Sequence, residues 1–214
     1  MKGLIIAAAL SSITTAGLAQ TLPGFRPSGL YDEQQMVIEN SPPGTRILIN
    51  APLQGFGEDD RVMLIMYALP NGNTIEQTFG KRLNDGDDWH YDIQHIGAQT
   101  RFLRKVITDR TVVVAYLEND LKSWPAWSAA TPEYPVKVRR MVEDIKSLFA
   151  PWDPELVLNG HSGGGRFIFN FLDAYEQIPV NVVRIAFLDS NYGWEDERYG
   201  PKIVSWLRSG KNRH

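Results

Sequence analysis

The sequence contains no cysteine among its 214 residues. Disulfide bonds and thiolate metal sites are therefore excluded, and an apolar core has to hold the fold together. Neither charge sign dominates, because 22 Lys and Arg residues are balanced by 25 Asp and Glu residues. The basic residues are scattered and form no stripe that could follow a phosphate backbone. The composition therefore gives little support for a nucleic-acid partner.

Long hydrophobic runs are also missing. The apolar stretch Leu4–Leu10 is too short to cross a bilayer, and no later segment is apolar over a sufficient length. The sequence has no internal repeat and no low-complexity segment. With 43% hydrophobic residues, the chain has enough apolar material for one sizeable core. We expect a single domain without a membrane span.

The first residues have the pattern of a secretory signal peptide. Lys2 supplies a positive start, Leu4–Leu10 the apolar stretch, and Gly17 and Ala19 the small residues before a cleavage site. We predict a signal peptide over residues 1–19 and one domain over residues 20–214. The protein would then be secreted or periplasmic. The alternative interpretation of this segment is a buried N-terminal helix.

The rest of the chain alternates between apolar runs and amphipathic segments. This alternation predicts an α/β fold with a mainly parallel sheet and helices on both of its faces. We expect a loop over Glu118–Pro135. The expected strands are Gln35–Glu39, Arg46–Pro52, Arg61–Leu69, Thr111–Leu117, Glu155–Asn159 and Val180–Ser190, and the expected helices are Asp92–Ile107, Val136–Phe149, Gly165–Ile178 and Ile203–Arg208.

The most informative stretch is LVLNGHSGGG, residues 156–165. A serine, Ser162, follows a predicted strand and precedes a predicted helix, with Gly160 two residues before it and Gly164 two residues after it. A sharp turn would bring these two positions into contact, and glycine removes the side chains that would clash. The order of strand, G-x-S-x-G and helix is that of a nucleophile elbow. Ser162 is therefore the candidate nucleophile.

Attack by a serine on a carbonyl creates an oxyanion, which needs hydrogen-bond donors. The amide of Gly163 stands at the start of the helix and is one candidate donor. A second donor is expected from PNGN, residues 70–73, which follows the strand Arg61–Leu69. We predict that Gly72 lets this backbone approach the substrate and that Asn73 donates its N–H group.

The glycine-rich turn has two other interpretations. It could be a tight connection without chemistry, because G-x-S-x-G also arises by chance. It could also be a phosphate-binding loop, but no Gly-Lys-Ser/Thr follows. The strand before the turn, the helix after it and the additional Gly165 favour the nucleophile elbow.

With these motifs the chain resembles the α/β-hydrolases from about Arg46 to Ser190. LVLNGHSGGG carries most of the resemblance, and ALPNGN stands where the family often has a His-Gly oxyanion loop, with Asn71 in place of the histidine. The resemblance implies a serine esterase, lipase or peptidase that acts through an acyl-enzyme without a cofactor or metal. Its substrate would be a small-molecule or polymer ester, and the oligomeric state stays open.

The family orders its triad as Ser, acid and His along the chain. Asp189, at the end of the strand Val180–Ser190, is the candidate acid; it could instead cap the following loop. His214 is the only histidine after Ser162 and is the last residue, whereas the family carries its histidine beyond further strands. We therefore expect the chain to be incomplete after the sixth core strand. The competing hypothesis is a hydrolase-like binding protein without activity, or a fragment lacking its catalytic histidine.

Overall fold

The computed structural model describes residues 21–214. The predicted signal peptide, residues 1–19, lies outside the described residues. Within residues 21–214, no helix combines the length and the apolar character needed to cross a membrane.

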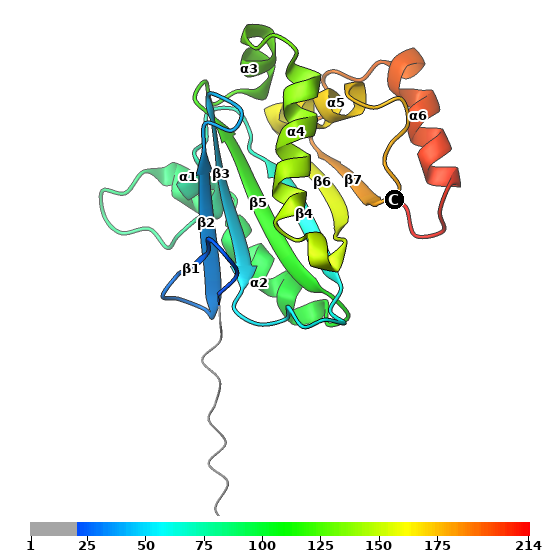
Figure 1. The fold of residues 1–214 in the computed structure, drawn as a ribbon. Coiled ribbons are helices and arrows are strands. Elements are labelled where there is room, and N and C mark those ends of the chain that lie inside the picture. Colours follow the sequence, from blue (N-terminus) through cyan, green and yellow to red (C-terminus); the bar gives the residue numbers. More distant parts are fainter. Residues whose placement is uncertain (1–20) are drawn as a thin grey trace, which may run out of the picture.

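A seven-stranded mixed sheet forms the centre of the molecule, with strand order β1-β2-β3-β5-β4-β6-β7 (Figure 1). Strands β4, β5, β6 and β7 pair in parallel, whereas β3 runs antiparallel to both of its neighbours. Most strands therefore point the same way, as predicted. The strands are β1 (Arg26–Pro27), β2 (Glu33–Glu39), β3 (Thr45–Pro52), β4 (Val62–Ala68), β5 (Thr111–Asn119), β6 (Glu155–His161) and β7 (Val182–Leu188).

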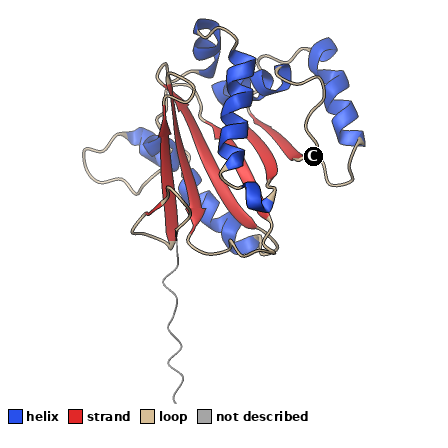
Figure 2. Ribbon diagram, in the orientation of Figure 1, coloured by secondary structure: helices blue, strands red, loops and turns tan. Residues whose placement is uncertain are grey.

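Helices cover both faces of this sheet (Figure 2). One face packs against α3, α4, α5 and α6, and the other packs against α1 and α2. The predicted α/β class with helices on both faces is confirmed. The helices are α1 (Ile75–Phe79), α2 (Ile96–Val106), α3 (Trp124–Ala130), α4 (Tyr134–Ser147), α5 (Gly165–Asp173) and α6 (Asp196–Arg208), with short 3-10 turns at Trp89–Asp92, Ala150–Trp152 and Ser162–Gly164.

The central strands bury both of their sides. Along β4, Leu64 and Met66 are fully buried on the α5 side, while Ile65 and Tyr67 are buried on the α2 side. An uninterrupted apolar sequence suits a strand of this kind, because neither face meets water. This is why Arg61–Leu69 could be recognised as a central strand from its sequence.

The prediction of a loop over Glu118–Pro135 was wrong in part, because this segment contains helix α3. Ser123 caps this helix by accepting a hydrogen bond from the N–H of Ala126, and Pro125 stands in its first turn. These are ordinary helix-start signals, but the segment is short. Trp124 and Trp127 of this helix are buried. Trp124 packs edge-on against Phe167 of α5. Tertiary packing of the two indole rings thus stabilises a helix that the local sequence signals weakly.

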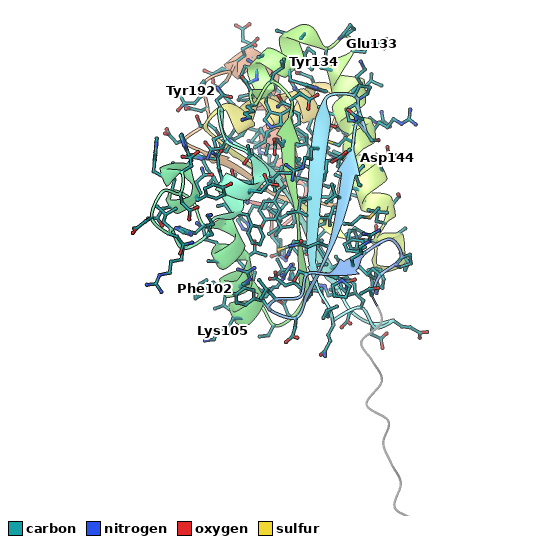
Figure 3. All side chains as sticks on the ribbon, turned by 90° about the vertical axis from the view of Figure 1, so that its left-hand side faces the viewer. Phe102, Lys105, Glu133, Tyr134, Asp144 and Tyr192 are labelled. Atoms are coloured by element: carbon teal, nitrogen blue, oxygen red, sulfur yellow. The ribbon has the colours of Figure 1, made fainter. Side chains whose placement is uncertain are left out.

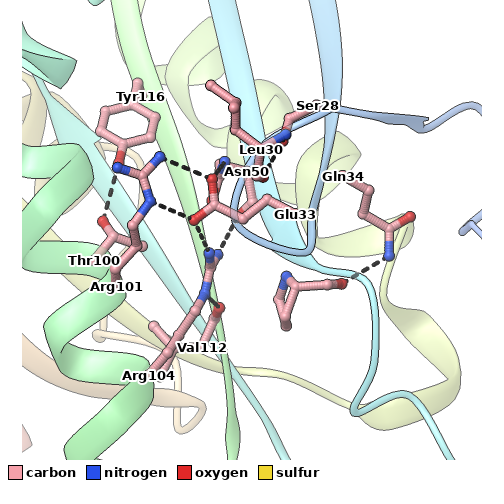
Figure 4. A network of polar contacts seen from close by, with 11 residues as sticks. Ser28, Leu30, Glu33, Gln34, Asn50, Thr100, Arg101, Arg104, Val112 and Tyr116 are labelled. Atoms are coloured by element: carbon pink, nitrogen blue, oxygen red, sulfur yellow. Dashed lines mark hydrogen bonds and ion pairs between the residues drawn. The ribbon is translucent and has the colours of Figure 1, made fainter. Parts of the chain in front are cut away.

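A buried ion cluster fixes α2 to the sheet (Figure 4). The carboxylate of Glu33 in β2 is 3% exposed and accepts hydrogen bonds from Arg101 and Arg104 of α2, at 2.9 to 3.0 Å. Asn50 of β3 donates a further bond to Glu33 at 3.1 Å. Arg104 also donates to the carbonyl oxygen of Asn50 at 2.9 Å. The single carboxylate therefore joins α2 to two neighbouring strands.

We expect Glu33→Gln to lower the free energy of unfolding by about 3 kcal/mol, because it leaves two partly buried guanidinium groups without their counter-charge. Glu76→Gln is the matched control: it removes the carboxylate that pairs with Arg46 at a half-exposed position, and we expect a loss of less than about 1 kcal/mol. Urea unfolding of both variants makes the comparison. Equal losses would show that burial of the Glu33 cluster does not matter.

Candidate active site

The backbone turns sharply where β6 ends and α5 is about to begin. Ser162 follows His161, the last residue of β6, and its φ angle is +49°. Positive φ is uncommon for a residue with a side chain, and such strain clusters at functional sites. It is also the backbone state that a nucleophile elbow requires. Ser162 is partly exposed, whereas Gly163 and Gly164 after it are buried.

The turn is tight enough to exclude side chains at its glycines. A Cβ atom on Gly160 would lie 2.6 Å from the carbonyl carbon and oxygen of Gly164. A Cβ atom on Gly164 would lie 2.2 Å from the carbonyl oxygen of Ala68, the last residue of β4. The predicted contact between the positions on either side of Ser162 is therefore present. The contact of Gly164 with Ala68 places the elbow against the end of β4.

The loop after β4 meets the elbow through Asn71. A Cβ atom on Gly163 would lie 1.9 Å from Oδ1 of Asn71, so the Asn71 carboxamide rests directly on the Gly163 backbone. Gly72 has a φ angle of +84° and donates its N–H to the carbonyl oxygen of Lys122 at 2.8 Å. This bond ties the loop to the end of β5. The sequence marked Asn71 only as a replacement, and its contact with Gly163 depends on the fold.

Asn73 follows in the same loop and is 8% exposed. In the described part of the chain, no acceptor takes its backbone N–H. Its side chain lines a small space together with Glu118 and Trp124. Burial raises the pKa of Glu118, whose carboxylate accepts the N–H of Ile75 at 2.7 Å. Asn73 thus supplies an unused backbone donor in the loop that touches the elbow.

The end of β7 reaches the elbow from the other side. Ser190 donates its hydroxyl to the carbonyl oxygen of Gly160 at 2.7 Å, and a Cβ atom on Gly165 would lie 2.1 Å from the Ser190 carbonyl oxygen. Asp189, the residue before it, is exposed and has a φ angle of +47°. Within residues 21–214 its carboxylate takes part in no hydrogen bond or ion pair. Asp189 therefore lies at the same edge of the sheet as Ser162, with its carboxylate free.

His161 is the histidine next to the candidate nucleophile in the sequence. It is partly exposed, and its Nδ1 atom is hydrogen-bonded to Nε2 of Gln94, in the loop that leads into α2. The other three histidines have different neighbours. His90 stacks on Trp89 at 3.9 Å between ring centroids, and this pair stands in the turn before α2.

The remaining two histidines also have their own surroundings. His95 is bonded through Nε2 to Asp92 at 2.7 Å. His214 accepts the N–H of Ile185 through its backbone oxygen and lines a groove on the α2 face of the sheet. None of the histidines in the described residues is hydrogen-bonded to Ser162. These residues also include no group of three or more His, Asp or Glu side chains placed to hold a metal ion.

The structure thus brings Ser162, Gly163 and the loop of Gly72 and Asn73 to one edge of the sheet, with Asp189 at the end of β7. Strand order, the elbow between β6 and α5, and the loop after β4 define an α/β-hydrolase-like fold.

Comparisons with known proteins find similar solved structures at low sequence identity. The chain is similar to an α/β-hydrolase-fold protein of unknown function, with 12% identity and a TM-score of 0.39 over 72% of this chain and 42% of that one. It is also similar to a cold-adapted esterase from an Arctic intertidal metagenomic library, with 9% identity and a TM-score of 0.40 over 72% of this chain and 59% of that one. The chain therefore spans about half the length of these neighbours. No family model and no curated protein matches the sequence.

We expect Gly164→Ala to destabilise the protein by about 1–3 kcal/mol, because its Cβ atom would overlap the Ala68 carbonyl and force two backbones apart. Gly57→Ala is the control, since its Cβ atom would meet only the side chain of Asp60, at 3.3 Å in an exposed loop. That change should stay within about 0.5 kcal/mol. Thermal or urea unfolding measures the stability of both variants. A Gly164→Ala variant as stable as the wild type would contradict the tight elbow.

Proposed function

We propose that the protein is an exported serine hydrolase that cleaves a carboxylic ester through an acyl-enzyme on Ser162. The observation that supports it most is the positive φ angle of Ser162 between a parallel strand and a helix. Such a turn holds a side chain out at the carboxyl edge of the sheet, where α/β proteins bind their ligands.

In the proposed reaction, the Ser162 Oγ atom attacks the ester carbonyl carbon and gives its proton to a base. The carbonyl electrons move onto oxygen, and the N–H groups of Gly163 and Asn73 bind the oxyanion. The alcohol leaves with a proton from the protonated base, and water then releases the acid from Ser162. The first N–H groups of a helix have no intrahelical acceptor, and the Asn73 N–H is unused, so both donors are free.

We choose the proposed partners of Ser162 from the residues at its edge of the sheet. Asp189 is the proposed acid, because it stands at the carboxyl end of β7 on the elbow's edge. The base is not assigned to a histidine of residues 21–214, since none is bonded to Ser162. This last observation favours a second candidate function: a hydrolase-like protein that binds an ester or related ligand without cleaving it.

A fluorophosphonate probe decides between these two functions. We expect it to label the folded 214-residue chain at Ser162, because an activated serine at an oxyanion site attacks phosphorus as it attacks a carbonyl. Ser162→Ala should abolish labelling, and Ser205→Ala, at an exposed serine of α6, should leave it unchanged. Peptide mass spectrometry locates the label. A folded 214-residue chain that stays unlabelled would overturn ester hydrolysis by this chain. Labelling that appears only in a chain extended past His214 would identify a fragment that lacks its base, and no labelling of either would support the binding protein.

The oxyanion assignment is separated from the nucleophile by a pair of variants at one position. Asn73→Pro deletes the backbone N–H, whereas Asn73→Ala keeps it. We expect the proline variant to label or turn over about 10²–10³ times more slowly than the alanine variant, which is the usual effect of losing one oxyanion donor. Circular dichroism of both variants checks that they fold. Equal rates would remove Asn73 from the oxyanion site.

Export is tested by the mature N-terminus. Expressed from its full sequence in a bacterial host, the protein should accumulate outside the cytoplasm and begin at Gln20, because cleavage after Ala19 fits the small residues at positions 17 and 19. N-terminal sequencing of the purified protein shows this. Replacing Ala19 by a large residue should block cleavage at this site. An intact Met1 on cytoplasmic protein would refute the proposed export.

A further inference from the structure

Strand β2 forms an open edge of the sheet over its second half. On its outer side, β1 pairs with Gln34 and Gln35. Residues 36–39 pair with β3 on the inner side, and no strand of the described chain pairs with them on the outer side. Figure 3 views the molecule from this end of the sheet. His214, the last residue of the sequence, lies beside β7 at the opposite end.

Two hydrogen bonds show which backbone groups of β2 point outward. Glu33 accepts the N–H of Ser28 on the outer side at 2.8 Å, and Asn40 donates its N–H toward the β3 side at 2.7 Å. The direction of these groups alternates along a strand. Val37 and Glu39 therefore point outward beyond the end of β1. Within residues 21–214, their backbone N–H and C=O groups have no partner on this side.

This part of β2 lacks the usual protection of a sheet edge. Natural edge strands are often protected by lysine, by proline or by a covering element. Residues 36–39 contain neither lysine nor proline. Val37 is 51% exposed, and Met36 and Ile38 are only partly covered. The charge of Glu39 is offset by Arg46, which stands opposite it in the β2–β3 register. The edge is therefore suited to pairing with another strand.

A second copy of the chain fits this edge under a twofold axis at Ile38. In that antiparallel register, Val37 faces Glu39 of the second copy, and each such pair exchanges two N–H···O bonds. An axis at Val37 is excluded, because Glu39 of the second copy would take the place that Arg26 holds beside Gln35. An axis at Glu39 would set two carboxylates directly opposite each other, which is unfavourable.

We propose that the protein self-associates as a twofold dimer in which the two β2 strands pair antiparallel about Ile38. A second copy brings a strand that is already formed, whereas a flexible peptide would lose conformational entropy for the same few bonds. Met36 and Ile38, which pack against the edge of the core, would be covered further in both copies. The dimer is weak, because the paired segment is short. It does not depend on whether Ser162 cleaves an ester.

A disulfide introduced at the axis tests this register, because the natural chain has no cysteine. In Ile38→Cys the two thiols stand directly opposite in a non-hydrogen-bonded pair, with Cα atoms about 4.5 Å apart, which suits a disulfide. Val37→Cys is the matched control. Its thiols lie on the diagonal, about 7–8 Å apart, beyond the reach of a disulfide. Under mild oxidation, we expect the Ile38→Cys chain to form a disulfide dimer about tenfold faster than the control.

A charge at position 37 tests the same register without a crosslink. Val37→Glu sets a carboxylate opposite Glu39 of the second copy, whereas Val37→Lys sets an ammonium group there. We expect Val37→Glu to weaken the dimer and Val37→Lys to strengthen it, with dissociation constants about tenfold apart, because each contact occurs twice. Sedimentation equilibrium of the 214-residue chain measures the constants, and circular dichroism shows that both variants fold.

Several results would overturn the proposal. A chain that is monomeric at every concentration has no such dimer, and equal crosslinking of Ile38→Cys and Val37→Cys would show another register or random collision. Crosslinking of Ile38→Cys that appears only after removal of residues 1–20 would assign the edge to those residues. A monomer that binds extended peptides from a displayed library, and loses them in Val37→Pro, would assign the edge to a partner polypeptide. That variant removes an outward N–H, which edge strands tolerate.

Discussion

Close backbone contact at the end of β6 is the constraint on which the candidate site depends. Gly160 touches Gly164 across the turn, and Gly164 touches the carbonyl of Ala68 at the end of β4. No side chain fits between these backbones. The contact holds Ser162 at positive φ and at the same time sets the distance between the elbow and the loop after β4. A single steric requirement therefore fixes both the backbone of Ser162 and its separation from the loop after β4.

The sheet supplies the rigid frame for this contact. Strands β4 and β6 are adjacent and parallel, so their carboxyl ends lie side by side, and β7 brings Ser190 to the base of the same turn. Glu33 clamps α2 to the far strands, and the loop before α2 reaches back to His161 through Gln94. Groups from four parts of the chain thus meet around one serine without any disulfide or metal site built on thiolates.

The same frame leaves one face of β6 and β7 partly uncovered. On the α5 side, Phe167, Phe169 and Phe171 are buried, whereas the α2 side ends in a groove lined in part by Arg184 and Lys211. Strand β7 is the edge strand beside this groove. Its Ile185 N–H donates to the carbonyl oxygen of His214, and its Val182 carbonyl oxygen accepts hydrogen bonds from Trp206 and Arg213.

Much of this protein could be predicted from its sequence, because apolar runs and glycine spacing report directly on strands and tight turns. The β6–Ser162–α5 elbow, the alternation of strands and helices, and the buried strand β4 were predicted on those grounds. Helix α3 was missed because buried tryptophans, and no strong local signal, stabilise it. The contact of Asn71 with Gly163, the Glu33 cluster and the open groove join residues far apart in the chain. Only tertiary packing decides such contacts, since no local pattern fixes which distant side chains meet.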